Sequence, residues 1–127
     1  MEIIPYGLWD KEGTLEFTEM ENGASHISVN NIGKADHSTF ISVMSLDKLI
    51  YDDVSFIKMD IEGAEYRAIR GAEKLIERCK PKLAISIYHK VEDIWELPEL
   101  ILKICPEYRL YMRHYSVAQA ETVLYAV

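Results

Sequence analysis

Apolar and polar positions in the first part of the chain predict short β-strands joined by turns. Residues 3–9 read as one strand, and residues 10–13 as a turn. Residues 15–20 alternate apolar and polar side chains, as a half-buried strand does. The pair Asn22-Gly23 that follows is a strong signal for a tight turn, so we expect a hairpin here.

A change of pattern near residue 52 divides the chain. Before it, residues 30–38 are polar and predict an exposed loop, and Ser45 is placed to cap a short helix with an apolar face. After it, strand and helix patterns follow one another. We therefore interpret the chain as one domain, with a β-rich hairpin segment at 1–52 and βαβ units with closing strands at 53–127.

The second part begins with a strand, a helix and another strand. Residues 54–59 predict a strand. Residues 64–79 repeat apolar side chains at helical spacing, and Pro81 is expected to end that helix. Residues 82–88 form a continuous apolar run, which indicates a strand that is buried on both faces, as in a parallel sheet.

The end of the chain predicts a helix and two further strands. Proline is unfavourable inside a helix, so we expect a turn at 92–96 and a helix beginning near Pro98. Residues 108–115 and 122–127 read as strands. The segment between them is too short for a crossover helix, so we expect the two strands to be antiparallel neighbours.

Composition narrows the classes of partner. The 127 residues are 49% hydrophobic and 28% charged, with a net charge of −7, which is typical of a globular protein. No cluster of Lys and Arg suggests a nucleic-acid or anionic-membrane partner, and no apolar run is long enough to span a membrane. The amino terminus does not resemble a signal peptide, so we expect a cytoplasmic protein.

Cysteines and large aromatic residues are expected to serve packing. Cys79 and Cys105 each end a predicted helix on its apolar side, so we expect reduced thiols in the core rather than a disulfide. No zinc-type ligand spacing is present, and we assign no metal ligands. Four aromatic residues are expected to lie in the core or at its margin: Trp9, Tyr66, Trp95 and Tyr111.

Two carboxylates mark the end of the strand at 54–59. Asp60 follows that strand directly, and Glu62 lies at the start of the next helix. One of them could act as a general base on a substrate hydroxyl, or both could orient the substrate or a cation. Alternatively, Glu62 serves only to interact with the amino end of the helix. Gly63 is expected to permit a tight turn.

His89 completes the candidate site, because the ends of adjacent parallel strands meet at one edge of a sheet. Its imidazole could act as an acid or a base near neutral pH, although a purely structural histidine is the alternative. Arg113 and His114 could lie at the same edge. His26 and His37 fall in segments that read as solvated loops.

Several segments together resemble the FkbM family of S-adenosylmethionine (SAM)-dependent methyltransferases. The main one is FIKMDIEGAE at 56–65, which is similar to the D-x-E-G motif of that family. The others are RGAE at 70–73, KPKL at 80–83, ISIYH at 85–89, ETVLY at 121–125, GTLEF at 13–17 and SLDKL at 45–49. The resemblance implies an α/β fold: a partial class I (Rossmann-like) methyltransferase sheet of parallel strands with helices and a terminal antiparallel hairpin.

The resemblance also implies a reaction and its cofactor. FkbM enzymes use SAM, and the expected reaction is O-methylation of a sugar or natural-product hydroxyl, with Asp60, Glu62 and His89 as the catalytic residues. The glycine-rich cofactor loop of the family has no counterpart among the widely spaced glycines of this sequence. We therefore interpret the chain as the carboxyl-terminal portion of a methyltransferase, inactive and unable to bind SAM measurably when alone.

Two other functions remain open on the sequence alone. One is a cofactor-less remnant that acts as an interaction or assembly module. The weaker one is a metal-dependent hydrolase that uses Asp60, Glu62 and His89. A small-molecule acceptor is the expected partner of the enzyme. The apolar strand at Val54–Met59 is expected not to remain a bare edge, and either an amino-terminal strand or a second copy of the chain, in a homodimer, would pair with it.

Overall fold

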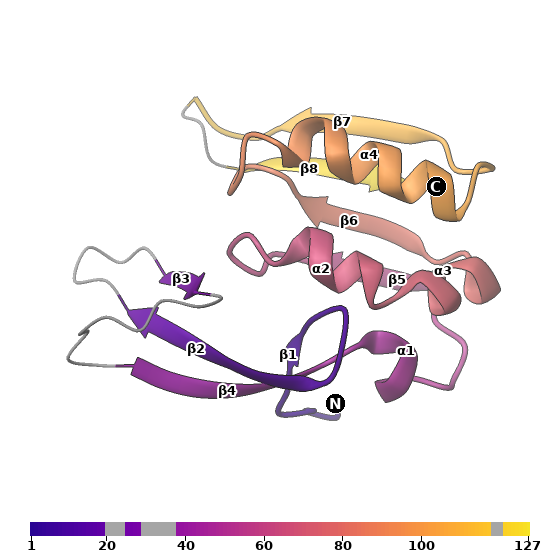
Figure 1. The fold of residues 1–127 in the computed structure, drawn as a ribbon. Helices are drawn as coiled ribbons and strands as arrows, with labels where there is room; N and C mark the ends of the chain where they lie inside the picture. The colour runs from indigo at the N-terminus through magenta and orange to yellow at the C-terminus, as the bar shows by residue number, and fades with distance from the viewer. Residues whose placement is uncertain (20–24, 29–37, 118–120) are drawn as a thin grey trace.

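A computed structural model describes residues 1–19, 25–28, 38–117 and 121–127, which form two four-stranded sheets (Figure 1). The strand order of the first sheet is β1-β4-β2-β3, in which β1 and β4 are parallel and the other pairs are antiparallel. The strands of this sheet are β1 (Gly7–Leu8), β2 (Gly13–Glu19), β3 (Ser25–Ser28) and β4 (Ser38–Met44).

The first sheet agrees only partly with the sequence pattern. The antiparallel pairing of β2 with β3 confirms the hairpin, although its turn at residues 20–24 lies outside the described residues, as do residues 30–37 and with them His37. The strand predicted at 3–9 is reduced to the two residues of β1. His26, expected in a loop, belongs to β3, and β4 begins at Ser38, where the sequence predicted a loop.

The second sheet has the order β5-β6-β8-β7 and combines both kinds of pairing. β5 and β6 are parallel neighbours, as predicted, and β7 and β8 form the predicted antiparallel hairpin beside β6. The expectation of a parallel Rossmann-like sheet is thus met by one pair of strands, and the described sheet is mixed. Its strands are β5 (Phe56–Met59), β6 (Lys82–Ser86), β7 (Leu110–His114) and β8 (Thr122–Ala126).

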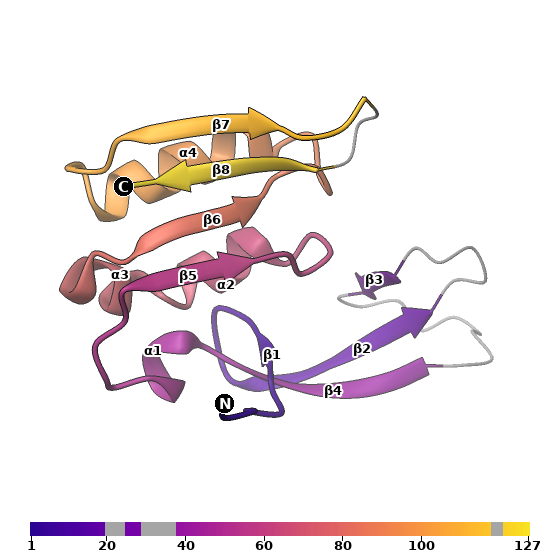
Figure 2. The same cartoon turned by 180° about the vertical axis from the view of Figure 1, so that it is seen from behind.

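Three helices cover one face of this second sheet. They are α2 (Glu65–Arg70), α3 (Glu73–Cys79) and α4 (Asp93–Ile104), whereas the short α1 (Leu46–Leu49) joins the two sheets. Figures 1 and 2 show α2, α3 and α4 on the same side of the strands. Buried apolar side chains of the helices and strands form the main core between them; these include Met59, Ile69, Ile76, Leu83, Ile85, Leu97, Ile101 and Leu124.

The helix predicted at 64–79 is interrupted at Gly71. A Cβ atom at this position would lie 2.1 Å from the carbonyl oxygen of Trp9, so only glycine permits this approach. The carbonyl of Gly71 accepts a hydrogen bond from the amide of Asp47, and the Asp47 carboxylate accepts from the amides of Lys74 and Leu75 at the start of α3. Contacts from α1 therefore stabilise two short helices in place of one long one.

The prediction that a helix begins near Pro98 was wrong, because α4 begins at Asp93 and contains this proline. A proline inside a helix leaves the carbonyl four residues earlier, here that of Ile94, without its usual amide donor. Ile94 itself is 47% exposed. Leu97 and Ile101 are fully buried on the other face, and their burial favours a continuous helix over the local cost of the proline.

Several packing predictions can be compared directly with the structure. Both cysteines are free, and Cys105 is buried, as expected. Trp9 is buried and Tyr66 packs against the core, as predicted. Trp95 and Tyr111 are more than half exposed, so the prediction that they lie in the core or at its margin was wrong. In the described part of the chain, no helix is long and apolar enough to cross a membrane.

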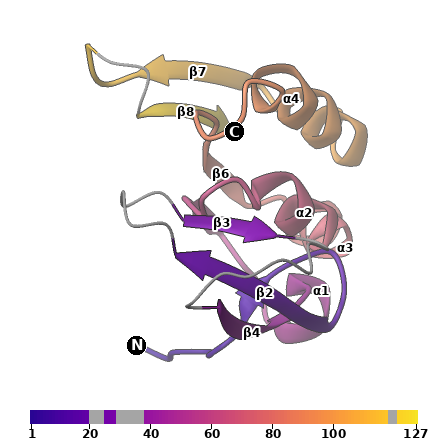
Figure 3. The ribbon, with the colours of Figure 1, turned by 60° about the vertical axis from the view of Figure 1, so that its left-hand side comes forward.

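The first sheet lies beside the β5 edge of the second sheet (Figure 2), on the side away from β7 (Figure 3). Neither amino-terminal strand pairs with β5: β1 pairs with β4, and β2 pairs with β3 and β4. Within the described residues, β5 is therefore hydrogen-bonded to β6 alone and forms one edge of its sheet. This result overturns the first of the two expected ways of covering β5.

Candidate functional site

Two parallel strands bring Asp60 and His89 to the same edge of the second sheet. Asp60 is the first residue after β5, and His89 follows three residues after the end of β6. The pairing of Met59 with Ile85 brings the two strand ends together. The carboxyl ends of parallel strands are where open α/β sheets bind their ligands. The predicted placement of Asp60 and His89 at one edge is thus confirmed.

The turn between β5 and α2 has an unusual backbone that positions Glu62. Glu62 has a φ of 56°, and Gly63 has a φ of 90°. The left-handed conformation suits glycine and is strained for a glutamate, a kind of strain that is common at functional sites. Gly63 also packs against Lys90 and His89, where a Cβ would lie 3.1 Å from Cε of Lys90. The expected tight turn at Gly63 is confirmed.

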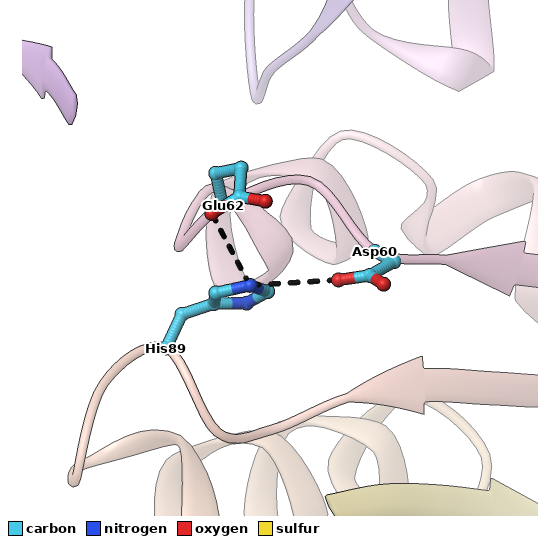
Figure 4. Close-up of side chains that lie close together, drawn as sticks. All are labelled: Asp60, Glu62 and His89. Atoms are coloured by element: carbon cyan, nitrogen blue, oxygen red, sulfur yellow. Dashed lines mark ion pairs between the residues drawn. The ribbon is translucent and has the colours of Figure 1, made fainter. Parts of the chain in front are cut away.

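The three predicted side chains form one cluster (Figure 4). Nε2 of His89 lies 3.5 Å from Oδ1 of Asp60 and 3.5 Å from Oε2 of Glu62. One ligand-type atom from each residue can be chosen so that all three lie within 4.8 Å of one another. The carboxylates are exposed, whereas the imidazole is 10% exposed. The site therefore presents a buried nitrogen and two accessible carboxylates to a common space.

A fourth residue, Glu65, contacts His89 on the side of the ring that faces away from Asp60 and Glu62. Its side chain is completely buried, and its Oε1 lies 3.0 Å from Nδ1 of His89. The same oxygen accepts a hydrogen bond from the amide of Ile61 at 2.8 Å. Among the described residues, neither nitrogen of the His89 ring is aligned for a hydrogen bond, and Oε2 of Glu65 also has no partner. The imidazole thus lies between the buried carboxylate of Glu65 at Nδ1 and the two outer carboxylates at Nε2.

Two neighbouring groups complete the electrostatic environment. The hydroxyl of Tyr88 donates to Oδ1 of Asp60 at 3.2 Å. Burial, together with the negative charge of Asp60, raises the pKa of Tyr88, so this hydroxyl keeps its proton and remains a donor. Asp93 at the start of α4 is buried, and burial, with the nearby Glu65 carboxylate, raises its pKa to about 6. Negative charge is therefore concentrated around His89.

A hollow of about 730 Å³ opens beside the cluster. His89 and Tyr88 line one side of it, and His114, from the carboxyl end of β7, lines another. Nδ1 of His114 is 2.8 Å from the hydroxyl oxygen of Thr122. The remaining lining side chains include the exposed apolar residues Val91, Ile94 and Val117. The lining of the hollow combines polar and apolar side chains, as small-molecule sites commonly do.

The structure brings together Asp60, Glu62 and His89 as predicted, and it places His114 at the same edge. Arg113 does not line the hollow; its guanidinium lies over the ring of Tyr115, 5.1 Å from the centroid. Glu65 also belongs to the site, although the sequence pattern did not predict this; it is the second residue after Gly63. A carboxylate in the first turn of a helix is favoured by the helix dipole, so the sequence pattern offered no reason to expect that Glu65 contacts His89.

Comparison with known proteins identifies the family. Residues 1–116 match the family model of the methyltransferase FkbM domain. The chain belongs to the FkbM methyltransferase family. Its structure is similar to the crystal structure of methyltransferase FkbM from Methylobacillus flagellatus KT, with 33% sequence identity and a TM-score of 0.73. A search of curated proteins found no match.

This FkbM chain spans only part of that relative. The structural match covers 96% of the present chain and 27% of the M. flagellatus chain. Members of this family use SAM in general. In the described part of the present chain, no strand leads through a glycine-rich turn into a helix except at Gly63, which packs against Lys90 and His89. We therefore assign none of the described residues to the cofactor.

Proposed function

We infer that this chain supplies the acceptor side of a methyltransferase that methylates a hydroxyl oxygen on a sugar or other natural product. Membership of the FkbM family supports methyl transfer in general. The observation that carries the choice of oxygen is the cluster of His89 with Asp60 and Glu62 beside an open hollow. Family membership supports neither of the alternatives, an assembly module or a hydrolase.

The chemistry of O-methylation explains why such a cluster is useful. When a methyl group moves to a hydroxyl oxygen, the proton of that hydroxyl must leave. The imidazole and carboxylates at this edge can bind the hydroxyl and draw off its proton, because they offer acceptor atoms in a partly buried site. Tyr88 fixes the orientation of Asp60 through its hydroxyl. Amine acceptors would not need a group that activates them as strongly.

The hollow supplies the place for the acceptor. Its apolar walls at Val91 and Ile94 can contact the carbon skeleton of a sugar or natural product, while His89 and His114 meet its hydroxyls. Holding the acceptor in one orientation lowers the entropic cost of the reaction, which is the main task of the protein when the donor is itself reactive. The apolar residues of the hollow would thus bind the acceptor, and the charged cluster would activate its hydroxyl.

The test has a binding arm and a transfer arm. Protein NMR of this chain with monosaccharides, polyols and matching amines should show shifts at the residues that line the hollow for the hydroxyl compounds. In the second arm, the chain replaces its matching segment in the M. flagellatus protein, and labelled SAM is supplied. We expect label on hydroxyl acceptors. Transfer only to amines or thiols, or shifts that map away from the hollow, would contradict the proposal.

A further inference from the structure

The spacing around His89 leaves room for an ion. Its Nε2 is 3.5 Å from a carboxylate oxygen of Asp60 and equally far from one of Glu62. These separations are too long for hydrogen bonds. Two ligand atoms bound to the same ion at about 2.1 Å are separated by roughly 3.0–3.5 Å. The distances are thus those of ligands around an ion rather than of a closed hydrogen-bond network.

The histidine provides evidence that is independent of the acidic residues. Two exposed carboxylates alone would be an ordinary acidic surface. His89 is nine-tenths buried, lacks a hydrogen-bond partner among the described residues, and directs Nε2 between the two carboxylates (Figure 4). A buried imidazole nitrogen without a partner is costly unless something binds it. An imidazole nitrogen and two carboxylates all offer electron pairs to the space between them, so this space favours a cation.

Glu65 adds the support that metal-binding histidines commonly have. A histidine that ligates a metal through one nitrogen usually directs the other toward a carboxylate, which fixes the ring orientation. Here Oε1 of Glu65 is 3.0 Å from Nδ1 of His89, on the side away from Asp60 and Glu62. Glu65 is completely buried, so the packing around it restricts the side chain to this position. The ring is therefore oriented before any ion arrives.

We propose that Asp60, Glu62 and His89 bind a divalent cation, which in turn binds the acceptor hydroxyl. This role of the cation rests on the proposed function. One imidazole and two carboxylates suit a first-row transition ion such as Mn²⁺ better than Ca²⁺, which prefers six to eight oxygens. Asp60 and Glu62 have side chains that are 44% and 57% exposed, so they can close on the ion.

The cation gives the site a definite way to activate the acceptor. A hydroxyl bound to a divalent cation loses its proton more readily, as metal-bound water does. The O–H bond of the acceptor breaks, and the proton passes to the outer carboxylate oxygen of Glu62 and then to solvent. The oxygen forms a bond to the methyl carbon, the C–S bond of the sulfonium donor breaks, and the sulfur keeps that electron pair.

Direct binding of Mn²⁺ tests the site without donor or acceptor. The full chain is titrated with Mn²⁺, and free Mn²⁺ is measured by electron paramagnetic resonance. We expect one equivalent to bind in the micromolar range. D60N, E62Q and H89A should each weaken binding at least about tenfold. The matched controls D53N and E107Q remove one exposed carboxylate each at other ion pairs and should bind as the unsubstituted chain does.

Two results would overturn the cation site: no Mn²⁺ bound at millimolar concentration, or binding that D60N and H89A leave unchanged. Circular dichroism of each variant shows whether it is folded.

The methyl-transfer assay distinguishes a failure of the cation site from a failure of the proposed function. Hydroxyl methylation that a chelator stops and Mn²⁺ restores supports the cation, whereas methylation unaffected by the chelator overturns its role and leaves the proposed function standing. Bound Mn²⁺ without any hydroxyl methylation overturns the proposed function, and with it the catalytic role of the cation, and leaves the cation site standing.

Discussion

Oε1 of Glu65 lies 3.0 Å from Nδ1 of His89 and also accepts the hydrogen bond from the amide of Ile61. One buried oxygen thus joins the turn after β5 to the loop after β6. The turn carries Asp60 and Glu62, and the loop carries His89. The contacts of Glu65 therefore fix the position of His89 relative to the two carboxylates. The site therefore depends on a residue that does not itself face the acceptor.

Replacing Glu65 should weaken the fold as well as the site. Glu65→Ala leaves the amide of Ile61 and the ring of His89 without their buried partner, so we expect a loss of about 1–3 kcal/mol in the free energy of unfolding. The control is Glu73→Ala, since Glu73 forms an exposed ion pair with Arg70 and should contribute no more than about 1 kcal/mol. Chemical denaturation measures both, and equal losses would contradict the role of Glu65.

Glu65→Gln separates positioning from folding. Glutamine keeps the size and can still accept from Ile61, but it lacks the charge that orients His89. We expect Mn²⁺ affinity to fall tenfold to a hundredfold, as for other carboxylates behind a ligating histidine. Mn²⁺ resonance of E65Q and of E73Q gives the comparison. An unchanged affinity in folded E65Q would show that Glu65 has only a structural role.

Asp93 should make stability depend on pH. Burial, and then the charge of Glu65, raises its pKa from 3.8 to about 6, while Lys90 and His89 oppose this and Glu96 adds to it. The folded state therefore binds the proton more tightly than the unfolded state. Ionisation at higher pH is penalised only in the folded protein, so this residue lowers stability as pH rises through the range from about 4 to about 6.

Asp93→Asn removes that titration. The variant and the unsubstituted chain should be similarly stable near pH 4, and above pH 6 the variant should be more stable by up to about 3 kcal/mol. Urea denaturation across this range gives the difference. A difference that does not change with pH would contradict the raised pKa. Asp53→Asn, at a fully exposed carboxylate, serves as the control.

Gly71 should tolerate no side chain. A Cβ there would lie 2.1 Å from the carbonyl oxygen of Trp9, a backbone atom that cannot rotate away. We expect Gly71→Ala to cost about 1–3 kcal/mol or more, since the chain at Trp9 must shift away from α2. Gly13→Ala is the control, because its nearest neighbour would be at 4.0 Å. Thermal unfolding compares the two, and a loss at Gly71 no larger than at Gly13 would refute the close approach.

The free edge of β5 remains a predicted contact between two copies of the chain. Within the described residues, β5 is paired only with β6, and Phe56 is 55% exposed. An unpaired apolar edge favours association with another strand, and a symmetric dimer closes it. Light scattering should give twice the mass of one chain, with slow amide exchange in Phe56–Met59. A monomer with rapid exchange there would contradict this prediction.

The site was easier to predict than the elements around it. Asp60 and His89 follow buried parallel strands, and adjacent parallel strands fix which ends meet, so the sequence pattern was sufficient. The contact of Glu65 with His89 depends on the exact rotation of α2, which no periodicity reveals. Gly71 and Pro98 were misread for one reason: contacts with Trp9, and burial of Leu97 and Ile101, outweighed local propensity.

The strand β4 illustrates a second limit. Thr39, Ile41 and Val43 alternate with other residues as a strand requires, yet the polar run before Ser38 predicted a loop. Its residues pair with partners in β1 and β2 that lie twenty or more residues away in the sequence. Whether such a segment forms a strand depends on the partner strands beside it, which the local sequence does not contain. The division of the chain near residue 52 nevertheless coincides with the boundary between the two sheets.

The central claim is that Asp60 and His89 act as one unit on the acceptor hydroxyl. A double-mutant cycle on methyl transfer tests it most directly, with D60N, H89A and the double variant placed in the M. flagellatus protein as described above. We predict that each single substitution lowers kcat/KM for a hydroxyl acceptor by at least about a hundredfold, and that the double variant is little worse than the poorer single one. Losses that simply multiply, or single variants that retain full activity, would contradict the claim.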